Sequence, residues 1–235
     1  MARSVVLAGT IRCEGCLLPP RWCVCRALEA VVTPLQVDVL LHHREQWRPT
    51  STGKLIQRVV DGTRIHDYRR GVPRVPASIA EPGRELWILH PRGEPFATIA
   101  ATPPDPARVQ VLLLDGSWNE AGQMLREVEH WGRRVSLPLG GTSRYLLREQ
   151  QGEGRLSTVE ALMGLLAAFG LHAAGAQLRL HFELHVYATL RARGHKSQAA
   201  EYLGGSPIKD ALPDLLARLM EPRPNEPSPP RPPQP

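Results

Sequence analysis

The chain has 235 residues, of which 42% are apolar, and a formal net charge of +6. This length suits one domain with a sizeable core, or one domain with a small appendage. No apolar run approaches the length of a membrane span and residues 1–10 lack a signal-peptide core, so we expect a cytoplasmic protein with no membrane contact. The positive charge favours a polyanionic partner such as RNA, although many proteins without such a partner carry similar charge.

The cysteines lie close together near the amino terminus, at Cys13, Cys16, Cys23 and Cys25. Their spacing places four thiols on two tight turns, and the Leu-Leu-Pro-Pro stretch between is long enough to bring the turns face to face. A reducing cytosol disfavours disulfides, whereas four soft ligands suit a closed, tetrahedral Zn²⁺ site. We therefore expect residues 1–30 to be a zinc-binding segment with a structural metal. A redox pair and unliganded thiols are the alternatives.

The main domain, expected over residues 31–220, begins with an apolar strand at residues 35–42. A hydroxyl-rich loop follows and leads into a helix from Leu55. The loop contains Arg48, Ser51, Thr52, Gly53 and Lys54. It lacks the upstream glycine of a P-loop, which argues against an NTPase. Hydroxyls and cations before a helix can hold a carboxylate or phosphate, but a capped surface loop would use the same residues.

A basic stretch at residues 64–74 includes Arg69 and Arg70, with an aromatic residue between its cations. This pattern suits an RNA backbone, and a solvated basic turn fits it equally well. A second strand is expected at residues 85–90 and ends at residues 91–94.

The apolar run at residues 109–114 stops at Asp115, Gly116, Ser117 and Trp118. A short apolar run closed by a turn is typical of a strand buried on both faces, and open α/β sheets bind ligands at the carboxyl ends of such strands. A helix is expected at residues 119–128. The alternative is that Asp115 only caps this helix and Trp118 only packs.

A fourth short strand is expected at residues 133–137, followed by a polar loop at residues 140–148 that carries Arg144, Tyr145 and Arg148. A helix then begins after Leu156, with Ser157 or Thr158 as its N-cap. Glu160 occupies the capping-box position if Ser157 is the cap. The free N–H groups at this helix start would suit an anion or a polar ligand edge.

The last expected helix covers residues 173–193 and places His181 and His185 four residues apart. A metalloprotease motif would need glutamate directly after the first histidine, so structural or RNA-facing histidines are favoured. Residues 221–235 are rich in proline and poor in apolar residues, which predicts a disordered tail.

Taken together, these segments resemble the DTW-domain family, the bacterial tRNA-uridine aminocarboxypropyltransferases. The blocks that carry the resemblance are the cysteine cluster and residues 42–55, 89–91, 112–121 and 156–161, in the family's order over about residues 10–205. One departure is visible, because Ser117 replaces the threonine of the family's Asp-x-Thr-Trp pattern. Serine keeps the hydroxyl and loses the methyl group.

The resemblance implies transfer of the 3-amino-3-carboxypropyl group of S-adenosylmethionine to N3 of a uridine in tRNA, with release of 5′-methylthioadenosine. It also implies a SPOUT-like α/β fold: a parallel sheet with helices on both faces and a knotted or tightly looped carboxyl half. The oligomeric state stays open, and a monomer is compatible with the sequence.

On this interpretation the catalytic residues are Asp115, Ser117 and Trp118, with Asp115 as general base or as partner of the donor's ammonium group. The expected S-adenosylmethionine site contains Leu89, His90, Pro91, Leu114, Gly116, Ser157, Thr158 and Glu160. The expected RNA-binding residues are Arg48, Ser51, Thr52, Gly53, Lys54, Arg69, Arg70, Arg144, Tyr145 and Arg148. Two rivals are a SPOUT-class RNA methyltransferase that uses the same donor, and a non-enzymatic zinc-bearing RNA-binding protein.

Overall fold

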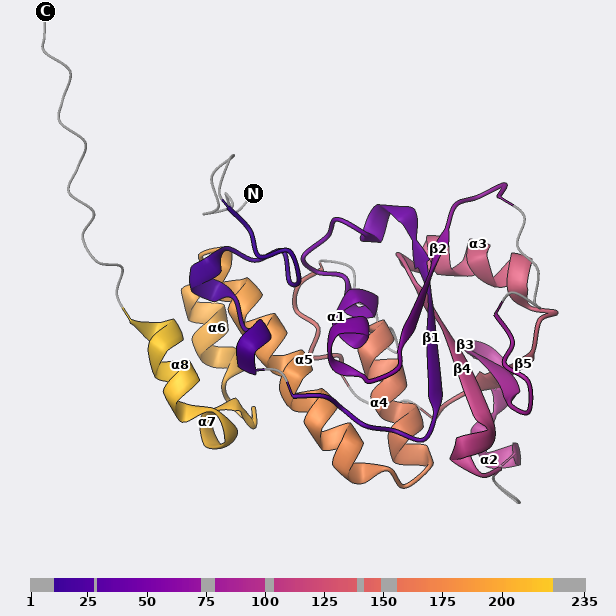
Figure 1. Cartoon of the computed structure of the whole chain (residues 1–235). Helices are drawn as coiled ribbons and strands as arrows, with labels where there is room; N and C mark the ends of the chain where they lie inside the picture. Colours follow the sequence, from indigo (N-terminus) through magenta and orange to yellow (C-terminus); the bar gives the residue numbers. More distant parts are fainter. Residues whose placement is uncertain are drawn as a thin grey trace, which may run out of the picture.

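The computed structural model describes residues 11–27, 29–72, 79–99, 104–138, 142–148 and 156–221. Its centre is a five-stranded sheet in the order β2-β1-β4-β3-β5, in which all neighbouring strands run parallel (Figure 1). The strands are β1 (Gln36–His42), β2 (Arg64–Tyr68), β3 (Glu85–Pro95), β4 (Val109–Asp115) and β5 (Arg133–Ser136). The expected parallel α/β sheet is confirmed.

Helices cover both faces of the sheet, as expected (Figure 1). One face packs against α1 (Thr52–Val59), α4 (Thr158–Ala168) and α5 (His172–Ala192), and the other packs against α3 (Trp118–Val128). The alternation along β4 explains this division, because Val111 and Leu113 enter the first core while Leu112 enters the second. The knot implied by the resemblance stays a prediction.

Two further parts pack onto α5. The helices α6 (Lys196–Tyr202), α7 (Ile208–Ala211) and α8 (Pro213–Met220) lie beside it, on the side away from the sheet (Figure 1). The cysteine-bearing segment contributes Leu18 and Trp22 to the same hydrophobic core, and the guanidinium of Arg191 lies 5.1 Å from the Trp22 ring. The short helix α2 (Phe96–Ile99) follows β3.

Two stretches are strands where the sequence did not indicate them. The first five residues of the basic stretch form the edge strand β2, and Arg64 forms two 2.8 Å hydrogen bonds with Asp38 of β1. Residues 91–94, at which the second strand was expected to end, continue β3 with a shift of register against β5. Glu94 and Arg133 hold this extension through two 2.9 Å bonds. β2 and the extension of β3 are both polar, so hydrophobic periodicity does not reveal them.

Within the described residues, no helix combines the length and the apolar character needed to cross a bilayer. The expected disordered tail, apart from residue 221, lies outside the described residues.

Candidate functional site

The carboxyl ends of β1 and β4 lie side by side, because the two strands are parallel neighbours with Leu41 opposite Asp115. From these two strands the chain continues in opposite directions across the sheet, from β1 to β2 and from β4 to β5. Such a switch point is where open α/β sheets leave a crevice for a ligand. The site predicted around Asp115 therefore lies at the edge of the sheet suited to binding.

Asp115 is buried, with 3% of its surface exposed, and its carboxylate accepts three hydroxyl hydrogen bonds. Ser51 donates to Oδ2 at 2.9 Å, and Thr52 and Thr158 donate to Oδ1 at 3.3 and 2.5 Å. These donors lie 64, 63 and 43 residues away in the sequence. The loop before α1 and the start of α4 thus meet at the end of β4.

Two helix starts converge on this carboxylate. Ser51 is the N-cap of α1, and Ser157 is the N-cap of α4 within the predicted capping box with Glu160. The positive ends of both helix dipoles therefore lie near the carboxylate, which is a favourable arrangement. Gly53 is needed for this approach, because a Cβ there would lie 2.7 Å from Cγ of Asp115.

A cavity of about 990 Å³ opens beside Asp115. Thirteen residues that the sequence analysis assigned to the site line this cavity, namely Thr52, Leu89, His90, Pro91, Leu114, Asp115, Gly116, Ser117, Trp118, Tyr145, Arg148, Ser157 and Thr158. Its volume lies at the upper end of the range of about 300–1,000 Å³ that is usual for small-molecule sites. The predicted donor-site and catalytic residues thus share one cavity, with the exception of Glu160.

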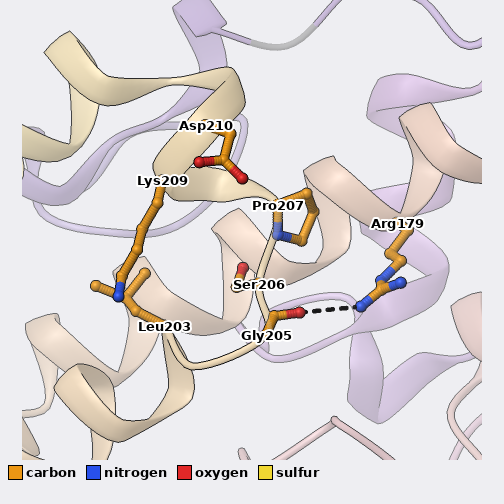
Figure 2. Close-up of a pocket in the computed structure, with 7 residues that line it drawn as sticks. All are labelled: Arg179, Leu203, Gly205, Ser206, Pro207, Lys209 and Asp210. Carbon is orange, nitrogen blue, oxygen red and sulfur yellow. Dashed lines mark hydrogen bonds between the residues drawn. The ribbon is translucent and has the colours of Figure 1, made fainter.

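A second cavity, of about 410 Å³, lies among the carboxyl-terminal helices (Figure 2). Arg179 of α5 donates to the carbonyl of Gly205 across it at 3.2 Å, and Lys209 and Asp210 line its other side (Figure 2). None of the residues singled out in the sequence line this cavity. It is also far smaller, so we regard the cavity at Asp115 as the candidate site.

Glu160 holds the wall of the cavity together rather than facing into it. Its carboxylate accepts from the N–H of Ser157 at 2.7 Å, the hydroxyl of Ser143 at 2.8 Å and the N–H of Arg144 at 2.8 Å. These bonds tie the loop at residues 142–148 to the start of α4. The contact between Glu160 and S-adenosylmethionine stays a prediction, because the contacts observed for Glu160 are with other residues of the protein.

The same loop is anchored at two further points. Arg144 pairs with Glu183 at 3.0 Å and donates to the carbonyl of Tyr202 at 2.9 Å. The hydroxyl of Tyr145 donates to the carbonyl of Thr50, and burial raises the pKa of Tyr145 to about 12. Arg144 and Tyr145, predicted to bind RNA, therefore have partners inside the protein.

Glu45 is a site residue that the sequence analysis missed. Its side chain is 0% exposed, and it pairs with Arg48 at 2.7 Å and with Arg148. Burial raises the pKa of Glu45, and the charges of the two arginines oppose that rise. No local pattern marks this glutamate as buried, because one of its partners lies 103 residues further along the chain.

Ser117, rather than Asp115, caps α3. Its hydroxyl accepts from the N–H of Glu120 at 3.3 Å, and the Glu120 carboxylate accepts from the N–H of Ser117 at 2.8 Å. Glu120 also lies 3.3 Å from Nδ1 of His42, whose pKa is lowered by burial. The simple capping role considered for Asp115 is therefore wrong.

Exposed basic and aromatic residues follow the carboxyl ends of β1 and β2, the end of the sheet at which Asp115 lies. Arg69 and Arg70, predicted to bind RNA, are exposed just after β2. In the loop after β1, Trp47 is 79% exposed and the Arg44 side chain is 66% exposed. Lys54 of α1 reaches back to this loop and donates to the carbonyl of Gln46 at 3.0 Å. These side chains lie near the carboxyl ends of β1 and β2.

The four cysteines form a cluster that fits a metal ion. Their sulfur atoms all lie within 4.8 Å of one another, and those of Cys13 and Cys25 are 3.8 Å apart. A tetrahedral zinc with bonds of about 2.3 Å would separate its sulfur ligands by about 3.8 Å. The donor set and its geometry therefore suit zinc.

The two histidines of α5 are structural. His181 and His185 are both buried, and Nε2 of His181 lies 2.9 Å from the carbonyl of Glu29. Burial lowers the pKa of both, that of His185 to about 3. The RNA-facing alternative is excluded by this burial.

Comparison with known proteins gives one result. The DTW domain profile matches residues 10–190, which include the cysteine cluster and the whole lining of the cavity at Asp115. No solved structure was found to match the chain.

Proposed function

Because the chain belongs to the DTW-domain family, we propose that it transfers the 3-amino-3-carboxypropyl group of S-adenosylmethionine to N3 of a uridine in tRNA. The second product would be 5′-methylthioadenosine. Membership of the family is consistent with a tRNA-modifying enzyme, and the specific reaction is our proposal. The observation that carries it is a buried carboxylate, held by three hydroxyls, in the wall of a cavity of about 990 Å³.

Asp115 retains capacity for a reaction partner. An ionised carboxylate offers about four lone-pair sites, and three are taken by the hydroxyls of Ser51, Thr52 and Thr158. One further donor can therefore bind. Two groups of the proposed reaction would fit, namely the N3–H of uridine, which Asp115 would deprotonate, and the ammonium group of the donor.

The chemical step is a single displacement. The bond between the sulfonium sulfur and the adjacent propyl carbon breaks as the bond from uridine N3 to that carbon forms. The sulfur keeps the bonding electron pair and leaves as a neutral thioether, while the N3 proton passes to Asp115 and then to water. The enzyme's main contributions would be alignment of the two reactants and removal of this proton.

The walls of the cavity suit a nucleoside donor. Leu89, Pro91 and Leu137 supply apolar surface, and Trp118 adds an aromatic ring at the opening. The uridine would have to leave its stack to reach the buried end of the cavity, as in other base-modifying enzymes. Trp118 would then stand between donor and acceptor.

The exposed residues near the carboxyl ends of β1 and β2 would bind the tRNA. Arg44, Arg69 and Arg70 offer exposed cations for phosphate groups, and the indole of Trp47 offers a face on which an unpaired base can stack. We expect tRNA binding to weaken as salt concentration rises, because phosphate contacts release counterions.

The cysteine cluster would hold a structural Zn²⁺ that fixes the amino-terminal segment against α5. Metal analysis of the purified protein tests this proposal, and about one zinc per chain is expected. Replacement of Cys16 by serine should lower the zinc content and the melting temperature together. A zinc-free protein of unchanged melting temperature would contradict it.

Mass spectrometry of nucleosides is the direct test of the reaction. Transfer RNA is incubated with S-adenosylmethionine and wild-type protein, Asp115→Ala, or the control Asp214→Ala, which replaces an exposed acid of α8. Wild type and control should give 3-(3-amino-3-carboxypropyl)uridine and methylthioadenosine, whereas Asp115→Ala should give neither. A methylated nucleoside with S-adenosylhomocysteine would support the methyltransferase instead. No modified nucleoside would support the RNA-binding protein.

A further inference from the structure

Glu45 and its two arginines form an unusual charge cluster beside the cavity. The glutamate is fully buried, and a buried charge is stable only when it is paired. Here one carboxylate is paired with two guanidinium groups, Arg48 and Arg148. The cluster therefore carries one net positive charge.

That charge is presented to the cavity by Arg148. Arg148 lines the cavity, whereas Arg48 does not. Among the described residues that line it, Arg148 is the one basic side chain other than histidine, and Asp115 is the one acidic side chain. The Arg148 side chain is 30% exposed, so its guanidinium is recessed rather than free in solvent. The cavity thus contains a positive group and a negative group.

The backbone around Arg148 is held on both sides. The hydroxyl of Tyr145 donates to the carbonyl of Thr50, and Arg193 of α5 donates to the carbonyl of Leu147 at 2.9 Å. Glu45 accepts from one terminal nitrogen of Arg148, and a guanidinium carries five N–H donors in a rigid plane. Glu45 therefore orients the group, and among the contacts of the described residues most of its donor capacity is left for a ligand.

We infer that Arg148 binds the α-carboxylate of the S-adenosylmethionine donor, and that Glu45 is the residue that positions it. This inference rests on the proposed function, because it assumes that donor. An α-amino acid end carries a carboxylate, which matches the guanidinium of Arg148 in charge and in planar shape. The cavity would then select donors by their amino-acid end, through a planar two-point contact between guanidinium and carboxylate.

A phosphate group of the RNA fits Arg148 less well. The exposed arginines near the carboxyl ends of β1 and β2 are better placed for a long polyanion, since the Arg44 side chain is 66% exposed. Arg148 was predicted from the sequence to bind RNA. Its recessed position and its buried partner favour a small anionic ligand within the cavity.

Three ligands that differ at one end test the inference on the full-length protein. S-adenosylmethionine has the whole amino-acid end, decarboxylated S-adenosylmethionine lacks the carboxylate, and methylthioadenosine lacks the entire end. Calorimetry is run on wild type, Arg148→Gln, Arg148→Lys, Glu45→Gln and the control Arg218→Gln. Arg218 is an exposed arginine of α8 that does not line the cavity.

Wild type should bind S-adenosylmethionine more tightly than its decarboxylated form. Arg148→Gln should weaken S-adenosylmethionine binding about 10- to 100-fold, the usual range for loss of a hydrogen bond to a charged group, and leave methylthioadenosine binding unchanged. Arg148→Lys keeps the positive charge beside Glu45 and should lose less of the affinity for S-adenosylmethionine. Glu45→Gln should also weaken S-adenosylmethionine binding and spare methylthioadenosine binding, but to a smaller degree than Arg148→Gln. Arg218→Gln should bind all three ligands as wild type does.

Two outcomes would overturn the inference and leave the proposed function in place. In one, the Arg148 variants bind S-adenosylmethionine as wild type does. In the other, they lose both S-adenosylmethionine and methylthioadenosine equally, which would indicate a structural role. If wild type binds neither S-adenosylmethionine nor methylthioadenosine, the proposed function fails and the inference fails with it.

Discussion

Asp38 and Asp115 are buried carboxylates on the neighbouring strands β1 and β4, and their surroundings differ. Asp38 accepts two bonds from Arg64, one from His66 at 2.6 Å and one from Gln110 at 2.9 Å. These four contacts use its full acceptor capacity, and two of them come from a cation. Asp38 therefore has no capacity left for a ligand.

Asp115, by contrast, is held by three neutral hydroxyls and faces a cavity. Its charge is not neutralised by a direct ion pair among the described contacts, and one acceptor site remains. The two acids thus differ in one respect: Asp38 is saturated by its neighbours, whereas Asp115 is oriented but keeps an acceptor site, as the proposed reaction requires.

The largest effect is expected for Asp115→Asn. Loss of a general base reduces a reaction rate about 10²- to 10⁴-fold, so transfer to tRNA should fall by that amount. If Asp115 acts as base, the maximal rate falls and the affinity for S-adenosylmethionine is unchanged. If it binds the ammonium group, that affinity falls as well. Single-turnover kinetics with calorimetry distinguish the two roles, and full activity would contradict both.

Gly53→Ala should have the next largest effect. The new Cβ would lie 2.7 Å from Cγ of Asp115, so the helix start or the carboxylate must move. A displacement of about 1 Å can cost about 100-fold in rate. Gly122→Ala in α3 is the matched control, because its Cβ would meet no atom within 4 Å. Activity assays of both variants should separate them, and equal activities would show that the tight approach at Gly53 is unimportant.

Asp38→Asn should affect stability rather than activity. Removal of the carboxylate leaves buried donors without their acceptor, and because Arg64 is partly exposed we expect a loss of about 1–3 kcal/mol in the free energy of unfolding. Urea denaturation measures this loss. Transfer activity should stay within about twofold of wild type. A large loss of activity in a folded Asp38→Asn variant would contradict the purely structural role of Asp38.

The stability that Asp38 provides should depend on pH. Burial by itself would raise its pKa, but hydrogen bonds from His66 and Arg64 outweigh burial and lower the pKa below the ordinary 3.8. A lowered pKa in the folded state means that the stabilisation is complete above that ordinary value and is lost as pH falls below it. Wild type and Asp38→Asn should therefore converge in stability below about pH 4. A difference that grows on acidification would contradict this assignment.

The smallest effect is expected for Thr158→Val, which removes one of the three hydroxyls at Asp115 while keeping the shape of the side chain. Loss of one hydrogen bond is worth about 1 kcal/mol, so activity should fall about fivefold. Thr189→Val is the control, because the Thr189 hydroxyl bonds to the carbonyl of His185 within α5. Equal activities would show that the remaining two hydroxyls suffice to orient Asp115.

Several features followed from local signals in the sequence. The apolar run of β4 and its stop at Asp115 predicted both the central strand and the place of the site. The Ser157–Glu160 capping box lies within one helical turn, and the cysteine spacing lies within one short segment. Each of these signals depends on residues that are close together along the chain.

Other features were missed or misassigned because their partners are distant. The polar strand β2 cannot be recognised from its own residues. It forms because it pairs with β1, where Asp38 accepts a hydrogen bond from Arg64. Glu94 and Pro95 extend β3 because β5 lies beside them. The short helices that follow α5 were not identified, since their apolar residues complete a core formed by other segments.

The sequence by itself therefore determined the class of the fold, the place of the carboxylate at the end of β4 and the fitness of the cysteines for a metal. The tertiary structure alone decided which buried acids are saturated with hydrogen bonds and which keep an acceptor site. Glu45 became a positioning residue only when Arg148 was brought beside it, and Asp115 gained its three hydroxyls from two separate helix starts. The reason is physical, because burial and charge pairing depend on contacts between segments that no local pattern contains.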